Sequence, residues 1–211
     1  QKGDLAGLAG PAFATNSFVL ADDIALTQGV WDFFRDKLEL RFNPDFQRRI
    51  AIADTIAWDC YDPVLNKAGQ LGILESVQKR EPPLTYLSAA LFASTLQRHR
   101  RVNKGGSDVL RDEALPIPVI ELPWDSLENL WELLSIPHEV GHDIETDLGI
   151  EDELSEVLAA ALDKAGVTGD DADRWNSWRS ELFADLVALQ LVGPPFAEYL
   201  LTLLLTPDKR A

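Results

Sequence analysis

The sequence predicts a mainly α protein of the α+β class, folded as a single domain over residues 1–211. Apolar residues recur at helical spacing through most of the chain, and proline, glycine and asparagine separate these stretches. One segment, residues 115–123, reads instead as a strand. An apolar share of 46% with 26% charged residues is ordinary for a globular protein. We expect residues 1–106 to form a helical N-terminal part and residues 107–211 to carry the functional site.

Three helices are expected in the N-terminal part. The first covers residues 19–40, where apolar positions follow the helical period. The second begins at Asn43, a cap residue followed by a proline at the first helical position, and runs toward Trp58. Pro63 either ends or bends it. The third follows two consecutive prolines and covers residues 86–101.

A positive cluster marks the end of this third expected helix in an otherwise acidic chain, and it consists of Arg98, Arg100, Arg101 and Lys104. Cations in the last turn of a helix interact favourably with its dipole by about 0.3–1 kcal/mol. A solvated helix end therefore explains the cluster, and a grip on a substrate carboxylate is the alternative. We expect His99, within the cluster, to be exposed rather than catalytic.

The second half of the chain is expected to hold one strand and several helices. Prolines at 116, 118 and 123 confine the strand at residues 115–123 to the edge of a sheet, because proline cannot donate to a ladder. Asp125 and Glu128 resemble a capping box that opens a helix through residue 134. Further helices are expected at residues 137–147, 151–164, 171–191 and 196–205.

The charge and cysteine content exclude some partners and compartments. A formal net charge of -16 repels nucleic acid and anionic membrane, so we expect neither as a partner. The apolar run near the C-terminus is interrupted by charged residues and prolines, as a membrane span is not. The single cysteine, Cys60, cannot form a disulfide within the chain and is expected to be a small buried hydrophobe. Nothing in the cysteine content requires an oxidising compartment, so a cytoplasmic location is expected.

His138, Glu139 and His142 form the pattern HExxH within the helix expected at residues 137–147. Residues four apart project from one face of a helix, so two imidazoles can converge on one zinc ion. Glu139 lies about 100° around the helix from His138 and can reach a water molecule beside the ion, where a general base belongs. The chain has three histidines, and two of them fall in this motif.

A catalytic zinc usually takes a third protein ligand and keeps one position for water. Glu181 and Asp185 lie four residues apart, and so on one face of an otherwise apolar helix. Burying unpaired carboxylates is costly, which implies a cation or strong donors opposite them. We therefore expect Glu181 as the third ligand and Asp185 as the acceptor for the outer ring N–H of a ligating histidine, His138 by preference.

HEVGH at 138–142 and ELFAD at 181–185 together resemble the gluzincin metallopeptidases, in which a Glu from a later helix joins HExxH. The resemblance covers residues 115–192 and implies a zincin-like architecture, with an edge strand that holds an extended peptide. Residues 115–123 precede the metal helix as that strand does. The interval between His142 and Glu181 is longer than in thermolysin-like members and contains an extra helix.

The resulting hypothesis is a zinc-dependent hydrolase that cleaves a peptide or protein substrate, with Glu139 as general base. The family's transition-state donor has no matching motif, and Tyr61, Tyr86, Tyr199 and His99 qualify by residue type alone. Two alternatives stay open: a non-enzymatic zinc-containing binding protein, and a zinc hydrolase of non-peptide amides or esters. Without a metal, the histidines would be ordinary helix-surface residues, and the carboxylates would pair with Arg179 or Arg174.

Overall fold

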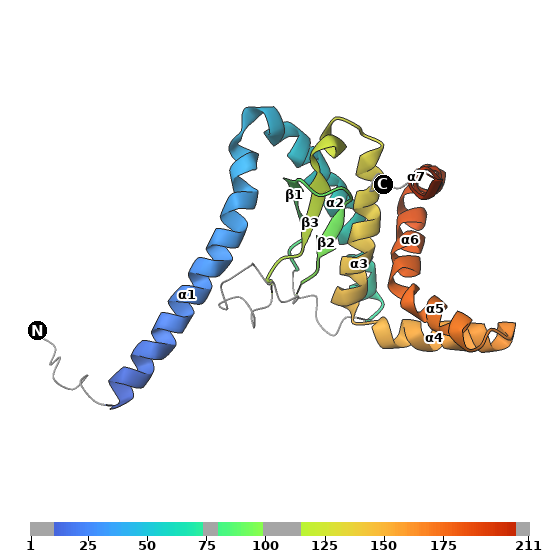
Figure 1. Cartoon of the computed structure of the whole chain (residues 1–211), viewed down its shortest axis with the longest axis horizontal. Coiled ribbons are helices and arrows are strands. Elements are labelled where there is room, and N and C mark those ends of the chain that lie inside the picture. The colour runs from blue at the N-terminus through green and yellow to red at the C-terminus, as the bar shows by residue number, and fades with distance from the viewer. Residues whose placement is uncertain (1–10, 74–79, 99–114, 206–211) are drawn as a thin grey trace, which may run out of the picture.

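The computed structural model describes residues 11–73, 80–98 and 115–205. This part of the chain is mainly helical and contains a three-stranded sheet, which confirms the mainly α class (Figure 1). The helices are α1 (Pro11–Glu39), α2 (Pro44–Gln70), α3 (Ile136–Leu148), α4 (Glu151–Ala165), α5 (Asp170–Ser177), α6 (Arg179–Val192) and α7 (Pro194–Leu205). The strands are β1 (Leu84–Ser88), β2 (Ser94–Leu96) and β3 (Val119–Pro123), and short 3₁₀ turns are η2 (Leu40–Phe42), η4 (Trp124–Leu127) and η5 (Glu132–Ser135).

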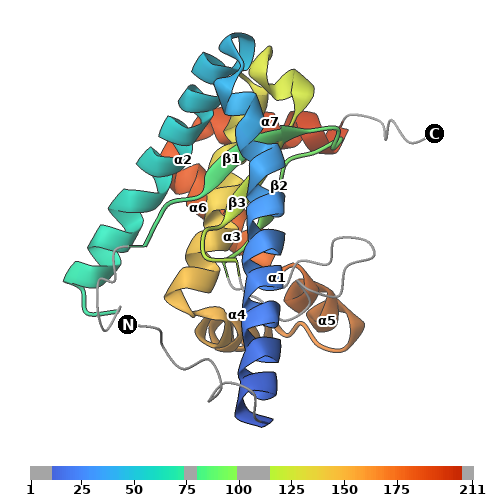
Figure 2. The same cartoon turned by 90° about the vertical axis from the view of Figure 1, so that its left-hand side faces the viewer.

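The sheet lies between helices. Helix α1 passes on one side of it and α3 on the other, with α6 beyond α3 (Figures 1 and 2). The main core joins α2 and α3 to β1 and β3, with Ala57, Ile120, Val140 and Ile144 almost fully buried. A smaller cluster packs Phe33 of α1 against the opposite side of β3. These contacts hold α3, the helix that carries HExxH, between the sheet and α6.

Strand β3 is the central strand of the sheet, so the prediction of an edge strand at residues 115–123 was wrong. The order is β1-β3-β2, with β1 parallel and β2 antiparallel to β3. None of the prolines interrupts the ladder: Pro123 is the last residue of the strand, and Pro118 precedes it and accepts from the backbone N–H of Leu84. The antiparallel edge strand beside α3 is β2.

The third expected helix, over residues 86–101, was also a wrong prediction. Residues 84–88 form β1, with Thr85 and Leu87 buried and their neighbours partly exposed. This alternation has a period of two and places every second side chain in the core. Residues 94–96 form β2. The alanine- and leucine-containing run between the strands favours a helix locally, but pairing with β3 prevails.

Arg98 is buried in the structure, which corrects its placement at a solvated helix end. Its side chain is 9% exposed, and its Nε lies 3.0 Å from Asp147 on α3. The same guanidinium donates to the carbonyls of Glu81 and Pro116, and Tyr61 donates its hydroxyl proton to Asp147. These bonds fix the C-terminal half of α3 to the segments flanking the sheet. The rest of the basic cluster, with His99, lies outside the described residues.

The remaining expected helices differ from the structure at three places. Asn43 caps α2 by accepting the Asp45 N–H, and α2 continues past Pro63 to Gln70 rather than ending there. The helix expected at residues 171–191 is divided at Trp178 into α5 and α6. The helix that a capping box at Asp125 predicted is also different. The structure forms the two 3₁₀ turns η4 and η5 there instead of an α-helix.

Other predictions for single elements were accurate. Helix α1 contains the expected residues 19–39, and α3, α4 and α7 lie within a few residues of their expected bounds. Cys60 is buried in α2, and burial, followed by the nearby Asp59 charge, raises the pKa of its thiol to about 11. Among the described helices, none combines the length and apolar character needed to cross a membrane.

Candidate metal centre

Helices α3 and α6 pack in close contact at Gly141. A Cβ atom at this position would lie 2.7 Å from the Ala184 Cα, a distance that real Cβ contacts essentially never show. Only glycine therefore allows the two backbones to pack so closely. His138 and His142 flank Gly141 on α3, and Glu181 and Asp185 flank Ala184 on α6, so this contact brings the two predicted pairs together.

The three predicted ligands present their donor atoms to one point. The Nε2 atoms of His138 and His142 lie 3.2 Å apart. Glu181 Oε2 lies 3.3 Å from the first and 3.6 Å from the second. Zinc with bonds of about 2.0–2.1 Å at tetrahedral angles holds its donor atoms about 3.3 Å apart. All three separations are close to this value, so the residues fit a zinc ion.

Hydrogen bonds at the outer ring nitrogens determine which way each imidazole presents its lone pair. His138 Nδ1 lies 2.8 Å from Asp185 Oδ1, and a carboxylate can only accept, so Nδ1 carries the proton. His142 Nδ1 lies 3.0 Å from the Ser180 hydroxyl oxygen. When His142 Nδ1 donates to Ser180 as His138 Nδ1 donates to Asp185, both Nε2 lone pairs face the shared point. Two lone pairs 3.2 Å apart repel unless a metal ion or a proton lies between them.

The pKa values of the two histidines shift in opposite directions. Burial lowers the pKa of His138, but its hydrogen bond to Asp185 and the charges of the neighbouring carboxylates outweigh this effect, and the pKa is raised. Burial and the nearby His138 lower the pKa of His142. The two rings are too close to carry positive charge together.

Glu139 lies beside these groups but outside the group of three donors. Glu139 is 6% exposed and lines the adjacent cavity. Burial raises its pKa to about 7; the His138 charge and a backbone hydrogen bond from Thr95 lower it, and the Glu181 charge raises it. A buried carboxyl group whose pKa lies near neutrality is suited to accept and return a proton.

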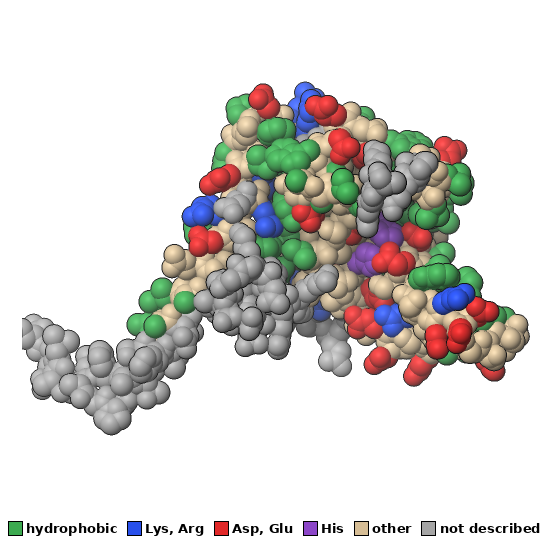
Figure 3. Space-filling view, viewed as in Figure 1, with side chains coloured by type: hydrophobic (Ala, Val, Ile, Leu, Met, Phe, Trp, Pro, Cys, Tyr) green, Lys and Arg blue, Asp and Glu red, His purple; other side chains and the backbone are tan. Residues whose placement is uncertain are grey.

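The carboxylates of α6 are more open than the sequence indicated. The Glu181 side chain is 62% exposed and that of Asp185 is 29% exposed. The prediction that both are buried in an apolar helix was therefore wrong, because this face of α6 opens to the cavity. Figure 3 shows histidine side chains (purple) at the surface, with acidic side chains (red) beside them.

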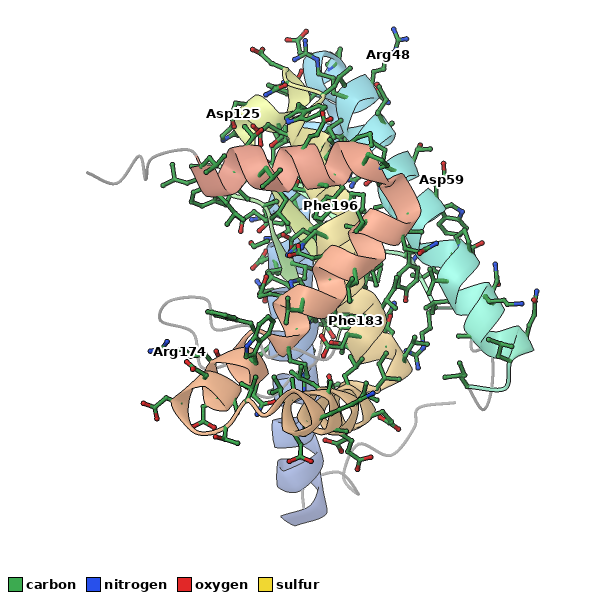
Figure 4. The ribbon with its side chains drawn as sticks, turned by 90° about the vertical axis from the view of Figure 1, so that its right-hand side faces the viewer. Arg48, Asp59, Asp125, Arg174, Phe183 and Phe196 are labelled. Carbon is green, nitrogen blue, oxygen red and sulfur yellow. The ribbon has the colours of Figure 1, made fainter. Side chains whose placement is uncertain are left out.

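A cavity of about 920 Å³ opens over the histidines and Glu139. One wall is β2 and the segment before it, and another is η5 with Trp131. The third wall is α7, which runs across the end of α6 in Figure 4, with Phe196 labelled beneath it. The Phe196 ring stacks on His138 at 6.4 Å between centroids. Lining residues in the described part of the chain include the carboxylates of Asp125, Glu132, Glu139 and Glu181 but no lysine or arginine.

The arginines suggested as partners of the α6 carboxylates bind elsewhere. Arg179 pairs with Glu145 at 3.0 Å, and Arg174 on α5 pairs with Asp171. Figure 4 shows Arg174 far from Phe196 and α7. Among the described residues, neither Glu181 nor Asp185 has an arginine or lysine partner, and both instead contact the histidines.

Several residues that complete the site were missed from the sequence. Ser180 bonds the outer ring nitrogen of His142, and Glu145 bonds Ser180. The only sequence signals for them are that Ser180 precedes Glu181 and that Glu145 follows His142 by three residues. Of the three tyrosines, Tyr199 alone lines the cavity. Tyr61 binds Asp147, and Tyr86 lies against Glu121 and Lys37.

No model of a known protein family matches the chain, and no curated protein and no solved structure matches it either.

Proposed function

We propose that the chain is a zinc-dependent hydrolase, and specifically a metallopeptidase. The observation that carries the proposal is the meeting of His138, His142 and Glu181, whose donor atoms lie 3.2–3.6 Å apart, with Glu139 beside them. The contact between Asp185 and His138 supports the likeness to the gluzincins that the sequence indicates. We further propose that α3, α6 and the small sheet represent a zincin-like core within one domain.

Zinc bound at such a site lowers the pKa of a water molecule to about 7 and polarises a substrate carbonyl. In the proposed reaction, Glu139 accepts a proton from the attacking water and delivers it to the leaving amine. Tyr199 is the candidate donor to the developing oxyanion, because it is the tyrosine that lines the cavity. Burial, followed by the Glu132 charge, raises its pKa to about 12, so its hydroxyl keeps the proton that a donor needs.

The edge strand supports a peptide rather than another amide or an ester as substrate. β2 is antiparallel to β3, borders the cavity through Ser94 and Thr95, and leaves one side unpaired within the described sheet. An extended peptide can add to such an edge through main-chain hydrogen bonds. A hydrolase of small amides or esters would make no use of this strand.

The cavity walls favour particular peptides. Trp131 and the leucines of α7 at 200, 203 and 204 supply apolar surface. The acidic lining, without lysine or arginine among the described residues, repels a free carboxylate. We therefore expect cleavage within apolar, neutral or cationic segments rather than removal of C-terminal residues. The single cysteine is compatible with a reducing compartment, and we propose the cytoplasm.

Incubation of the purified protein with a mixed peptide library is expected to give cleavage between residues with apolar side chains. A chelator should abolish this cleavage and added zinc should restore it, with product formation followed by mass spectrometry. Zinc binding without any cleavage would favour the non-enzymatic alternative. Cleavage of esters or small amides in place of peptides would favour the other alternative. Hydrolysis that resists the chelator would contradict both zinc-hydrolase hypotheses, the peptidase and the ester or amide hydrolase.

A further inference from the structure

We propose that Ser180, Glu145 and Arg179 form a polar relay that orients His142 and so sets the affinity of the site for zinc. The inference rests on the proposed metal site and concerns positioning residues, since none of the three lies among the donor atoms. It is independent of whether the substrate is a peptide. The relay runs from α3 to α6 and back, and its first member, Ser180, contacts Nδ1, the ring nitrogen of His142 that faces away from Glu181.

The direction of each hydrogen bond follows from the chemistry of Ser180. Its hydroxyl oxygen lies 2.5 Å from Glu145 Oε2 and 3.0 Å from His142 Nδ1. A serine hydroxyl has one proton, and an ionised carboxylate can only accept, so the proton points to Glu145. The serine oxygen must then accept the Nδ1–H of His142. This leaves the Nε2 lone pair of His142 directed at the point shared with His138 and Glu181.

Glu145 forms a buried ion pair with Arg179. The Glu145 side chain is 2% exposed, and its second oxygen, Oε1, accepts from the Arg179 guanidinium at 3.0 Å. A carboxylate this deeply buried is costly without a partner, whereas a charged pair with further hydrogen bonds is tolerated. Glu145 therefore has both oxygens engaged, one by Arg179 and one by Ser180, and cannot rotate away without leaving a buried charge unpaired.

Arg179 is fixed in turn by a third helix. Its NH1 donates to the Ser155 hydroxyl at 2.5 Å and to the Glu151 carbonyl at 2.8 Å, both on α4. The relay thus connects the ring of His142 to the first turns of α4 and α6. Three consecutive residues at the start of α6 thus have separate roles. Arg179 binds Glu145 and α4, Ser180 orients the His142 ring, and Glu181 faces the two histidines.

The two histidines are therefore supported in different ways. His138 donates directly to Asp185, whose side chain is 29% exposed. His142 donates through a serine to a carboxylate that is 2% exposed and paired. Outer partners that hold a ligating histidine typically change metal affinity by about 10- to 100-fold when they are removed. The buried relay behind His142 should act in this range.

The test measures zinc affinity by competition with a chromophoric chelator in the wild type and in Ser180→Ala, Ser180→Thr and Glu145→Gln. Ser180→Ala and Glu145→Gln are expected to weaken zinc binding by about 10- to 100-fold, and Ser180→Thr, which keeps the hydroxyl, should bind as the wild type does. Nitrogen-15 NMR of the histidine rings in the zinc-loaded protein reports how the His142 ring is hydrogen-bonded. Since the chain has three histidines, the His142 signals can be assigned, and Ser180→Ala should shift its Nδ1 signal.

Asp147→Asn is the matched control for stability. It removes a buried carboxylate bonded to arginine from the same helix, and Asp147 contacts Arg98 and Tyr61 rather than a histidine. It should lower the melting temperature without changing zinc affinity. Wild-type affinity in Ser180→Ala, with zinc still bound by the wild type, would overturn the relay alone. A wild-type chain that binds no zinc would overturn the metal site and the relay together.

Discussion

Replacing Glu139 by glutamine is expected to lower kcat/KM for peptide hydrolysis by about 100- to 10,000-fold, the usual contribution of a general acid–base group. Glutamine keeps the shape of the side chain but cannot accept the proton of the attacking water. Zinc affinity should stay at the wild-type value, because Glu139 is not one of the three residues whose donor atoms converge. The measurement pairs steady-state kinetics on a cleaved library peptide with zinc titration.

Asp143→Asn provides a control on the same helix. Asp143 is 1% exposed and bonds the Thr95 hydroxyl of β2 at 3.0 Å, on the side of α3 that packs against the sheet. Burial raises its pKa well above the usual value, so asparagine closely resembles its neutral form. This variant should retain activity. Full hydrolysis by Glu139→Gln would remove the enzyme proposal, whatever metal the protein binds.

Replacing Gly141 by alanine is expected to destabilise the fold and to weaken zinc binding together. The added methyl group would lie 2.7 Å from the Ala184 Cα, which is backbone and cannot turn aside. Overpacking of this kind costs about 1–3 kcal/mol, which outweighs the gain of about 1 kcal/mol in helix propensity from glycine to alanine. The helices must separate, and the donor atoms on α3 then move away from Glu181.

Thermal unfolding and zinc titration of the same samples measure both effects. A second variant identifies the cause: Ala184→Gly removes the Ala184 methyl group but keeps the Cα and the carbonyl oxygen, so it should not rescue Gly141→Ala, whose closest contact is with the Cα atom. If Gly141→Ala melts at or above the wild-type temperature and binds zinc as tightly, close packing at this point is not what assembles the site.

The helices and the site residues on them could be predicted because they depend on local spacing. Side chains four residues apart in a helix lie on one face, and this rule alone pairs His138 with His142 and Glu181 with Asp185. Proline and glycine mark the ends of α3 and α4 in the sequence. In the structure each predicted pair lies within one helix, the histidines in α3 and the carboxylates in α6.

The sheet and the relay could not be predicted, because both depend on contacts between distant segments. Residues 84–96 contain alanine and leucine and favour a helix locally, but β1 and β2 form by pairing with β3, which follows more than twenty residues later. Arg98 seemed a surface cation because its partner, Asp147, is remote in sequence. Glu145 and Ser180 are likewise separated by the whole of α4 and α5.

The zinc content of the purified chain, compared between the wild type and Glu181→Ala, tests the central claim most directly. Glu181 is largely exposed, so alanine should leave the fold intact. Asp125→Ala is a control because Asp125 lines the same cavity but does not belong to the group of converging donor atoms. The proposed site predicts one zinc ion per wild-type and per Asp125→Ala chain, and its loss from Glu181→Ala. A wild-type chain without a bound divalent ion, or undiminished zinc binding by Glu181→Ala, would contradict it.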